Sequence, residues 1–277
     1  MKYSAPRSLA YHAVLCAASV VMLYPLLWML ASSFRSNADI FTSTSIWPRH
    51  FDFSAYARGW NGLQVSFGRF FVNSFVIAVL SVAGNLLSCS LAAYAIARLR
   101  FRGRDVCFAL MLGTMMIPYQ VTLIPQYILF LNIGWVNTIL PLVVPKFLAV
   151  DAFFIFLLTQ FFRGLPRELD EAAVMDGCSP WRIYWNIILP LSLPALGTAA
   201  IFTFIFTWDD FFGPLVYLTD MQTFTVQLGL RGFLDSGGTS DWGAMFAMAV
   251  LTLIPVMAFF LFFQRTLIQG IATTGLK

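Results

Sequence analysis

The most regularly spaced polar residues of the chain lie in one stretch, residues 165–191, between two strongly apolar segments. A group of carboxylates ends at Glu171, where negative charge suits the positive end of a helix dipole. Glu171 can also offer its carboxylate to a basic partner, and the small side chains of Ala172 and Ala173 let another surface approach closely. These residue types predict recognition of a partner protein. The alternative is an ordinary amphipathic helix at a membrane surface.

The punctuation of this stretch predicts two short helices. Pro166 suits the first position of a helix, and Gly177 suits the left-handed conformation that ends one. Ser179 and Pro180 suit the N-cap and first position of a second helix. We therefore expect a helix–turn–helix loop over residues 163–189 that leads into the next apolar run.

Catalytic and metal-binding patterns are absent from the sequence. It has no Gly-x-x-x-x-Gly-Lys-Ser/Thr run to hold phosphate, no HExxH or GxSxG motif, and no CxxC pair. The four cysteines are expected to be free thiols. The basic residues are spread among loops instead of forming one aromatic-lined patch, which argues against nucleic acid as a partner. We expect neither an enzyme nor a metal site.

The composition is that of a polytopic membrane protein. Of the 277 residues, 59% are hydrophobic and 11% are charged, whereas a soluble domain carries about a quarter charged residues. Six apolar runs are each long enough, at about 20 residues, to cross a bilayer as a helix. They cover residues 9–31, 70–97, 106–131, 138–162, 190–218 and 242–263. The sequence thus predicts an all-α fold with six transmembrane helices in a single domain, residues 1–277.

Basic residues predict the orientation of these spans, because they mark cytoplasmic loops. Eleven of the 17 lie in the two tails, in the loop 98–105 and in the loop 163–189, against five on the opposite side. Both termini and the helix–turn–helix loop are therefore expected in the cytoplasm. Within the third run, Pro118 and Pro125 are expected to kink or break the helix.

Charges inside or at the ends of apolar runs suggest a substrate pathway. A charge near the centre of a span costs roughly 2.5–3.5 kcal/mol, so it normally faces a cavity or a partner. The candidates for such a pathway are Asp151, Trp208, Asp209, Asp210 and Phe211. For the adjacent pair of aspartates, the alternative is solvated residues at a helix end.

Lys146 and Asp151 are the two charges of the fourth run. Residues five apart lie about 140° apart around a helix, so we expect these two side chains not to pair with each other. Each then needs another partner or water, and structural pairing with a neighbouring helix is the alternative to a role in transport.

The spacing of the helix–turn–helix loop resembles a known motif. Glu171-Ala172-Ala173, followed by Gly177 and by Ile187-x-Leu189-Pro190, resembles the EAA loop of permease subunits of binding-protein-dependent ABC importers. The resemblance implies that this loop docks into a cleft on a separate ATPase subunit. The docking residues that it implies are Glu171, Ala172, Ala173, Asp176 and Gly177.

Other segments resemble sugar-type permeases, in particular the smaller permease subunit of the maltose system. They are residues 115–125, 206–215 and 263–270. The resemblance implies a bacterial cytoplasmic (inner) membrane protein that transports a sugar or related polyol by alternating access. It also implies a second, different permease subunit, two ATPase subunits that bind ATP-Mg, and an extracytoplasmic sugar-binding protein. The chain itself is expected to bind no cofactor.

The glycine-rich loop 228–241 is expected on the outer face. The resemblance implies that it reaches into the docked binding protein, because small residues can enter a cleft where larger side chains would clash. The residues in question are Gly232, Asp235, Gly237 and Gly238. The alternative is a plain solvated connector.

Two rival functions remain at this point. An ion-coupled secondary carrier could use Asp151 or Asp209 as its coupling site, and its uptake would survive ATP depletion. A membrane receptor or scaffold would move no substrate at all. The spacing of the EAA-like residues argues against both.

Overall fold

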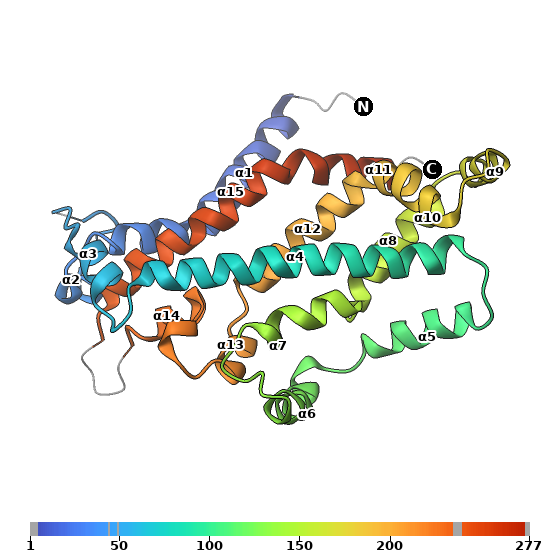
Figure 1. Cartoon of the computed structure of the whole chain (residues 1–277). Helices are drawn as coiled ribbons and strands as arrows, with labels where there is room; N and C mark the ends of the chain where they lie inside the picture. Colours follow the sequence, from blue (N-terminus) through green and yellow to red (C-terminus); the bar gives the residue numbers. More distant parts are fainter. Residues whose placement is uncertain (1–4, 44, 49, 235–239, 275–277) are drawn as a thin grey trace. The chain divides into compact units, whose positions relative to one another are not determined.

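The computed structural model describes residues 5–43, 45–48, 50–234 and 240–274, with side chains described from residue 11 to residue 264 of these ranges (Figure 1). Within the described ranges every regular secondary-structure element is a helix, as the sequence predicts. The residues form two compact units, Met1–Gly68 with Gly229–Ile254 and Arg69–Leu228 with Pro255–Lys277. The expectation of a single domain stays a prediction.

The first unit contains the first transmembrane helix and two short helices that follow it. Its elements are α1 (Ala5–Ser32), α2 (Asn37–Thr42), α3 (Ser54–Asn61) and the first part of α15 (Trp242–Thr274). Trp28 packs edge-on against Phe246 with ring centroids 5.3 Å apart. Gly59 lets α3 approach α15 closely, because a Cβ at this position would lie 2.8 Å from the Met248 side chain.

The second unit contains the long helix α4 and the helices that pack on it. Its elements are α4 (Phe67–Arg98), α5 (Arg104–Thr114), α6 (Tyr119–Asn132), α7 (Leu140–Val143), the 3-10 helix η1 (Val144–Leu148), α8 (Ala152–Gly164), α9 (Glu168–Met175), α10 (Pro180–Ile183), the π-helix η2 (Tyr184–Ile188), α11 (Leu189–Leu191), α12 (Leu193–Trp208), α13 (Phe212–Tyr217), the 3-10 helix η3 (Met221–Thr223), the first half of α14 (Val226–Arg231) and the second part of α15. A core of buried side chains from α4, α8, α10 and α12 holds the unit together, including Ala93, Leu158, Phe162 and Ala199.

The structure agrees with the prediction of six spans. Four helical segments are long and apolar enough to cross a membrane: Tyr11–Ser32, Phe67–Arg98, Leu140–Gly164 and Trp242–Gln264. Two further pairs of helices qualify if each bent pair counts as one span. The pair α5 and α6 bends by 99° at a break that contains Pro118, which confirms the predicted break. Pro125 lies inside α6.

The fifth span differs from its predicted range of 190–218. Its helical segment begins at Pro180, bends by 77° between α11 and α12, and ends at Trp208. The second helix of the loop therefore runs on into the membrane-spanning segment. The π-helix just before Pro190 makes this possible, because a wider turn relieves the clash between a proline ring and the carbonyl four residues back.

The prediction that Lys146 and Asp151 do not pair was wrong. Their side chains form an ion pair, with 2.9 Å between Lys146 Nζ and Asp151 Oδ2. The prediction assumed one continuous α-helix, but the helix is interrupted here. Ala149 is left-handed, with φ 55°, and Asp151 has ψ 84°. These two residues fold the chain back, so the carboxylate returns to the ammonium group.

Candidate functional site

The turn between α9 and α10 has the geometry that the sequence predicts. Gly177 is left-handed, with φ +78°. The amide of Cys178 donates to the carbonyl of Ala173 (2.9 Å), and the amide of Gly177 donates to the carbonyl of Val174 (3.0 Å). These two bonds are those of the Schellman motif that ends helices at a glycine. The turn between the two helices is thus well defined. Residues 168–191 are called the docking loop below, after the role that the resemblance implies.

The second helix of the docking loop also begins as predicted. The Ser179 side chain accepts a hydrogen bond from the amide of Arg182, and Pro180 is the first helical residue. The first helix begins slightly later than predicted, at Glu168, so Pro166 precedes it. A proline two residues before the first full turn has no intrahelical bond to lose.

A buried ion pair fixes α9 to the end of α4. Arg98, the last residue of α4, has a side chain that is only 2% exposed. Its Nη1 lies 3.1 Å from Asp170 Oδ2, and its Nη2 donates to the carbonyl of Leu165 at 2.9 Å. One guanidinium thereby holds both the entrance to α9 and its first turn.

Two further residues on the same face of α4 hold the rest of the docking loop. The Tyr94 hydroxyl donates to the carbonyl of Pro180 at 2.9 Å. Ser90 and Tyr184 share a hydrogen bond of 2.7 Å between their hydroxyls. Ser90, Tyr94 and Arg98 follow one another at intervals of four residues, which places them on one face of a helix. Figure 1 shows α9 and α10 at this end of α4.

The outward side of α9 is apolar and acidic. Ala173 is buried, whereas Glu171, Val174 and Met175 are exposed, Met175 by 87%. Large exposed apolar side chains next to a free carboxylate are typical of a protein interface. A partner that buried Met175 would remove this apolar surface from water.

The predicted docking residues therefore fall into two groups. Ala173 packs inward, and Glu171, Ala172, Asp176 and Gly177 are exposed. Sequence reasoning missed Arg98, because it lies some seventy residues before its partner in the chain. It also missed Met175, whose side chain could not be assigned to the outward face without the geometry of α9.

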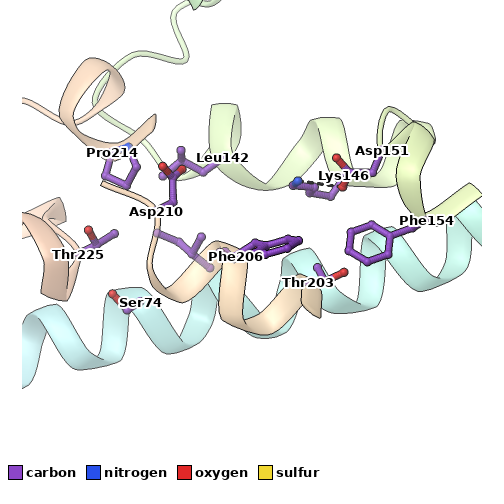
Figure 2. A pocket seen from close by; sticks show the side chains of 12 residues that line it. Ser74, Leu142, Lys146, Asp151, Phe154, Thr203, Phe206, Asp210, Pro214 and Thr225 are labelled. Atoms are coloured by element: carbon purple, nitrogen blue, oxygen red, sulfur yellow. Dashed lines mark hydrogen bonds and ion pairs between the residues drawn. The ribbon is translucent and has the colours of Figure 1, made fainter. Parts of the chain in front are cut away.

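A polar cavity of about 110 Å³ lies within the second unit (Figure 2). Its lining comes from α4, α7, η1, α8, α12 and the chain around α13 and α14. The charged and hydroxyl-bearing residues of the lining are Ser74, Lys146, Asp151, Thr203, Thr207, Asp210 and Thr225. A small number of polar groups that converge in a concave site is typical of ligand-binding sites.

The structure brings together two of the five predicted pathway residues. Asp151 and Asp210 line the cavity. Trp208 is buried and stacks on Phe204 with ring centroids 5.6 Å apart, so it serves packing. The two other residues, Asp209 and Phe211, are absent from the cavity lining.

The cavity also has an aromatic residue that was not predicted as part of the pathway. Phe206, two residues before Trp208, lines it beside Asp210 (Figure 2). Residues two apart lie on nearly opposite sides of a helix, so Phe206 faces the cavity whereas Trp208 faces the core. The helical period could have suggested this if the buried face of α12 had been known.

Of the predicted contact loop on the outer face, only Gly232 can be described. Its amide donates to the carbonyl of Gly229 at 3.0 Å, and a Cβ there would lie 3.2 Å from Leu63. Asp235, Gly237 and Gly238 lie outside the described residues. Their predicted role stays a prediction.

An ion pair orders the start of α15 beside Gly232. Arg58 Nε lies 2.9 Å from Asp241 Oδ2, and the Asp241 carboxylate also accepts from the amide of Ala244 at 3.0 Å. Burial alone would raise the pKa of Asp241, but the hydrogen bonds from Arg58, Ala244 and Asn37 outweigh it and lower the pKa. The same bond to Asp241 raises the pKa of Arg58.

Comparison with known families identifies the family of this chain. Residues 84–273 match the family described as "Binding-protein-dependent transport system inner membrane component". The chain belongs to this family. Its members are permease subunits of ABC importers and are not themselves enzymes, so the resemblance stated from the sequence and the expectation of no enzymatic activity are both confirmed.

Three curated relatives are similar over nearly the whole permease. The diacetylchitobiose uptake system permease protein of Streptomyces coelicolor is 32% identical over 262 residues, 94% of this chain and 86% of the relative. The trehalose/maltose transport system permease protein of Thermococcus litoralis is 33% identical over 260 residues, 94% of this chain and 93% of the relative. The sn-glycerol-3-phosphate transport system permease protein of Escherichia coli is 31% identical over 266 residues, 94% of each chain.

A solved structure shares the fold of the permease. It is the crystal structure of a bacterial ABC transporter involved in the import of the acidic polysaccharide alginate. The TM-score is 0.83 at 24% identity, and the match covers 96% of this chain and 99% of the other. This likeness confirms the all-α transmembrane fold.

Proposed function

We propose that this permease forms half of the pathway by which an ABC importer moves a sugar or related polyol across the bacterial inner membrane. Support comes from family membership and from relatives that are named for diacetylchitobiose and for trehalose and maltose. The chain works with a second, different permease subunit. Six spans enclose only half of such a pathway, and an extracytoplasmic binding protein delivers the sugar.

The docking loop couples this pathway to ATP hydrolysis on two separate ATPase subunits that bind ATP-Mg. The observation that carries this proposal is the two-sided character of α9. Its inner side is fixed by Arg98, and its outer side offers Glu171 and Met175 to a partner. A cleft on the ATPase with a basic residue for Glu171 and an apolar floor for Met175 fits this surface. Closure of the ATPase dimer then moves α9, and α4 with it, so that the pathway alternates between its two faces.

The docking proposal is tested on the outer side of α9. Glu171→Ala and Met175→Ser are expected to reduce co-purification of the ATPase and to lower ATP-driven uptake about tenfold. Asp105→Ala, which removes an exposed carboxylate from another predicted cytoplasmic loop, is the matched control and should leave both unchanged. If both α9 variants behaved like Asp105→Ala, α9 would be a surface helix without a docking role.

The energy source separates this function from its rivals. Uptake into proteoliposomes with the full assembly should require ATP inside the vesicles and persist with an uncoupler. Uptake that persisted without ATP and stopped with an uncoupler would identify an ion-coupled carrier. Absence of uptake under every condition would leave a receptor or scaffold.

The orientation that docking requires has its own test. With native cysteines replaced, Ser43→Cys should react with an impermeant thiol reagent in intact cells, and Gly103→Cys should react only after the membrane is opened. Gly103 lies in the basic loop before α5 and has no heavy atom within 4 Å of a built Cβ, so a cysteine meets no clash there, although φ +86° places it under backbone strain. The reverse labelling pattern would place the docking loop outside and exclude ATPase docking.

A further inference from the structure

The polar cavity of the second unit carries a charge that protein groups do not balance. Its lining has one ammonium group, on Lys146, and two carboxylates, on Asp151 and Asp210. Lys146 pairs with Asp151 at 2.9 Å (Figure 2). Among the described residues Asp210 forms no ion pair, so the lining is formally one unit negative. Within a membrane protein an unbalanced carboxylate is costly and marks a functional site.

A buried hydroxyl in the same lining also lacks a partner. Thr225 is 4% exposed, and its Oγ1 has no hydrogen-bond partner among the described residues. Its neighbours are satisfied: Ser74 accepts from the amide of Val226 at 2.9 Å, and Thr203 accepts from Asn85 at 2.7 Å. A buried polar group without a partner is unfavourable, and because the Oγ1 atom has almost no exposed surface, a ligand hydroxyl can bind it only when the Thr225 side chain turns toward the cavity.

The backbone holds the Asp210 carboxylate at the cavity. The amide of Gly213 donates to Asp210 Oδ1 at 3.1 Å. A Cβ at Gly213 would lie 2.5 Å from Asp210 Oδ2, so only glycine allows the carboxylate this position. Asp210 is therefore positioned by the chain before any ligand arrives, which lowers the entropic cost of binding.

We propose that Asp210 and Thr225 bind hydroxyl groups of a neutral sugar or polyol, and that this site selects against acidic sugars. The proposal rests on the proposed function and adds a substrate class to it. A carboxylate is an acceptor only, which suits the hydroxyl donors of a sugar and repels a uronate or phosphate group. Lys146 offsets this repulsion only in part, because its ammonium group is paired with Asp151.

The size and apolar part of the cavity fit the same ligand. A volume of about 110 Å³ is well below the roughly 300–1,000 Å³ of sites that enclose a drug-sized ligand. It therefore admits one edge of a sugar and not a whole oligosaccharide. Phe206 lines the cavity beside Asp210 and can pack against the C–H face of the sugar ring (Figure 2).

Binding is measured on the purified permease–ATPase assembly without the binding protein, so that only the membrane site is tested. The probes are maltose and diacetylchitobiose as neutral disaccharides and digalacturonate as the acidic one, with affinities from saturation-transfer NMR. We expect Asp210→Asn to weaken neutral binding about tenfold, which corresponds to about 1.4 kcal/mol. Thr225→Val should weaken it about threefold. Asn keeps an oxygen for the amide of Gly213, so the local fold should hold.

Asp209→Asn is the matched control, because this adjacent carboxylate is exposed and accepts from Gln227 outside the cavity lining. The wild type should bind digalacturonate at least tenfold more weakly than the neutral probes, and Asp210→Asn should narrow that gap.

The proposal is overturned if Asp210→Asn binds like Asp209→Asn, if digalacturonate binds as well as maltose, or if no neutral probe binds. A failure of the proposed function would look different. ATP-driven uptake by the wild-type assembly would then be missing for every sugar, whatever these variants bind.

Discussion

The docking loop and the polar cavity use charged residues in opposite ways. In the docking loop the supporting charge, Arg98, is buried and paired, and the motif carboxylate, Glu171, is free at the surface. In the cavity, the Lys146–Asp151 pair and the unpaired Asp210 share one enclosed space. A surface that meets a protein can leave its carboxylate in water until docking. The site within the second unit instead holds its carboxylate at the cavity before any ligand arrives.

The two regions also differ in which polar groups are left without a hydrogen-bond partner. Three residues of α4 hold the docking loop through hydrogen bonds of 2.7 to 3.1 Å. In the cavity, Ser74, Thr203, Asp210 and the Lys146–Asp151 pair are also hydrogen-bonded at 2.7 to 3.1 Å, but the Thr225 Oγ1 atom has no partner among the described residues. Two atoms of the loop attachment, Arg98 Nε and Asp170 Oδ1, also lack partners among the described residues, but their groups are bonded through other atoms, whereas the Thr225 hydroxyl is not. Three features can be tested in turn: the attachment of α9 to α4, the turn at Gly177 and, for comparison, the solvent-accessible ion pair of Arg58 with Asp241.

The largest effect is expected when the buried attachment is cut. Arg98→Met leaves the Asp170 carboxylate and the Leu165 carbonyl without their donor. Breaking a buried ion pair costs about 3–5 kcal/mol, and the partial exposure of Asp170 favours the lower end. We expect a lower unfolding temperature and more ATP hydrolysed per sugar transported, because α9 can then move without α4.

The control for this variant is a second arginine of the same loop. Arg102 is exposed, so Arg102→Met should leave both stability and coupling unchanged. Arg98→Lys keeps the charge but cannot reach both partners with a fork of donors, and it should fall between the two. Normal coupling in Arg98→Met would mean that the contact with α4 only supports folding.

The next effect tests the turn itself. Gly177→Val places a β-branched residue at φ +78°, which costs at least about 1–2 kcal/mol. A Cβ at Gly177 meets no heavy atom within 4 Å, so the cost is backbone strain alone. We expect ATP-driven uptake to fall roughly tenfold with less ATPase co-purified. Gly177→Asn, which tolerates the left-handed conformation, should retain most of both, and equal loss in the two variants would indicate a side-chain clash with the partner.

The two regions also differ in how far the sequence could predict them. The docking loop is contiguous, and its signals are local: Gly177 ends a helix, and Ser179 with Pro180 begins the next. Those positions were predicted and confirmed, because cap chemistry depends on a few neighbouring residues. Arg98 escaped prediction because its partner is set by how α4 and α9 pack.

The cavity depends on packing throughout. Ser74, Lys146 and Thr225 come from separate elements, and no sequence spacing relates them to one another or to the end of α12, where Phe206 and Asp210 lie four residues apart. The error on the Lys146–Asp151 pair has the same origin. A regular helix was assumed, and the left-handed residue at 149 that reverses the chain is an alanine, which gives no sequence signal for this conformation. Hydropathy located the spans but could not show where they break.

The smallest effect is expected at an ion pair that water reaches, Arg58 with Asp241 at the start of α15. Asp241→Asn keeps the N-cap acceptor for Ala244, since Asn caps as well as Asp, and removes only the charge. Exposed pairs contribute roughly 0.2–1 kcal/mol, so the unfolding temperature should fall by at most about 3 °C at pH 7. Because the folded pKa of Asp241 is lowered, this contribution is present above the unfolded value, about 3.9, and is lost as the pH falls through the folded one. Unfolding curves of wild type and Asp241→Asn should therefore converge as the pH falls below the unfolded value. A difference that stayed constant with pH would assign the effect to the cap and not to the charge, and an effect as large as that of Arg98→Met would mean that burial does not distinguish the two ion pairs.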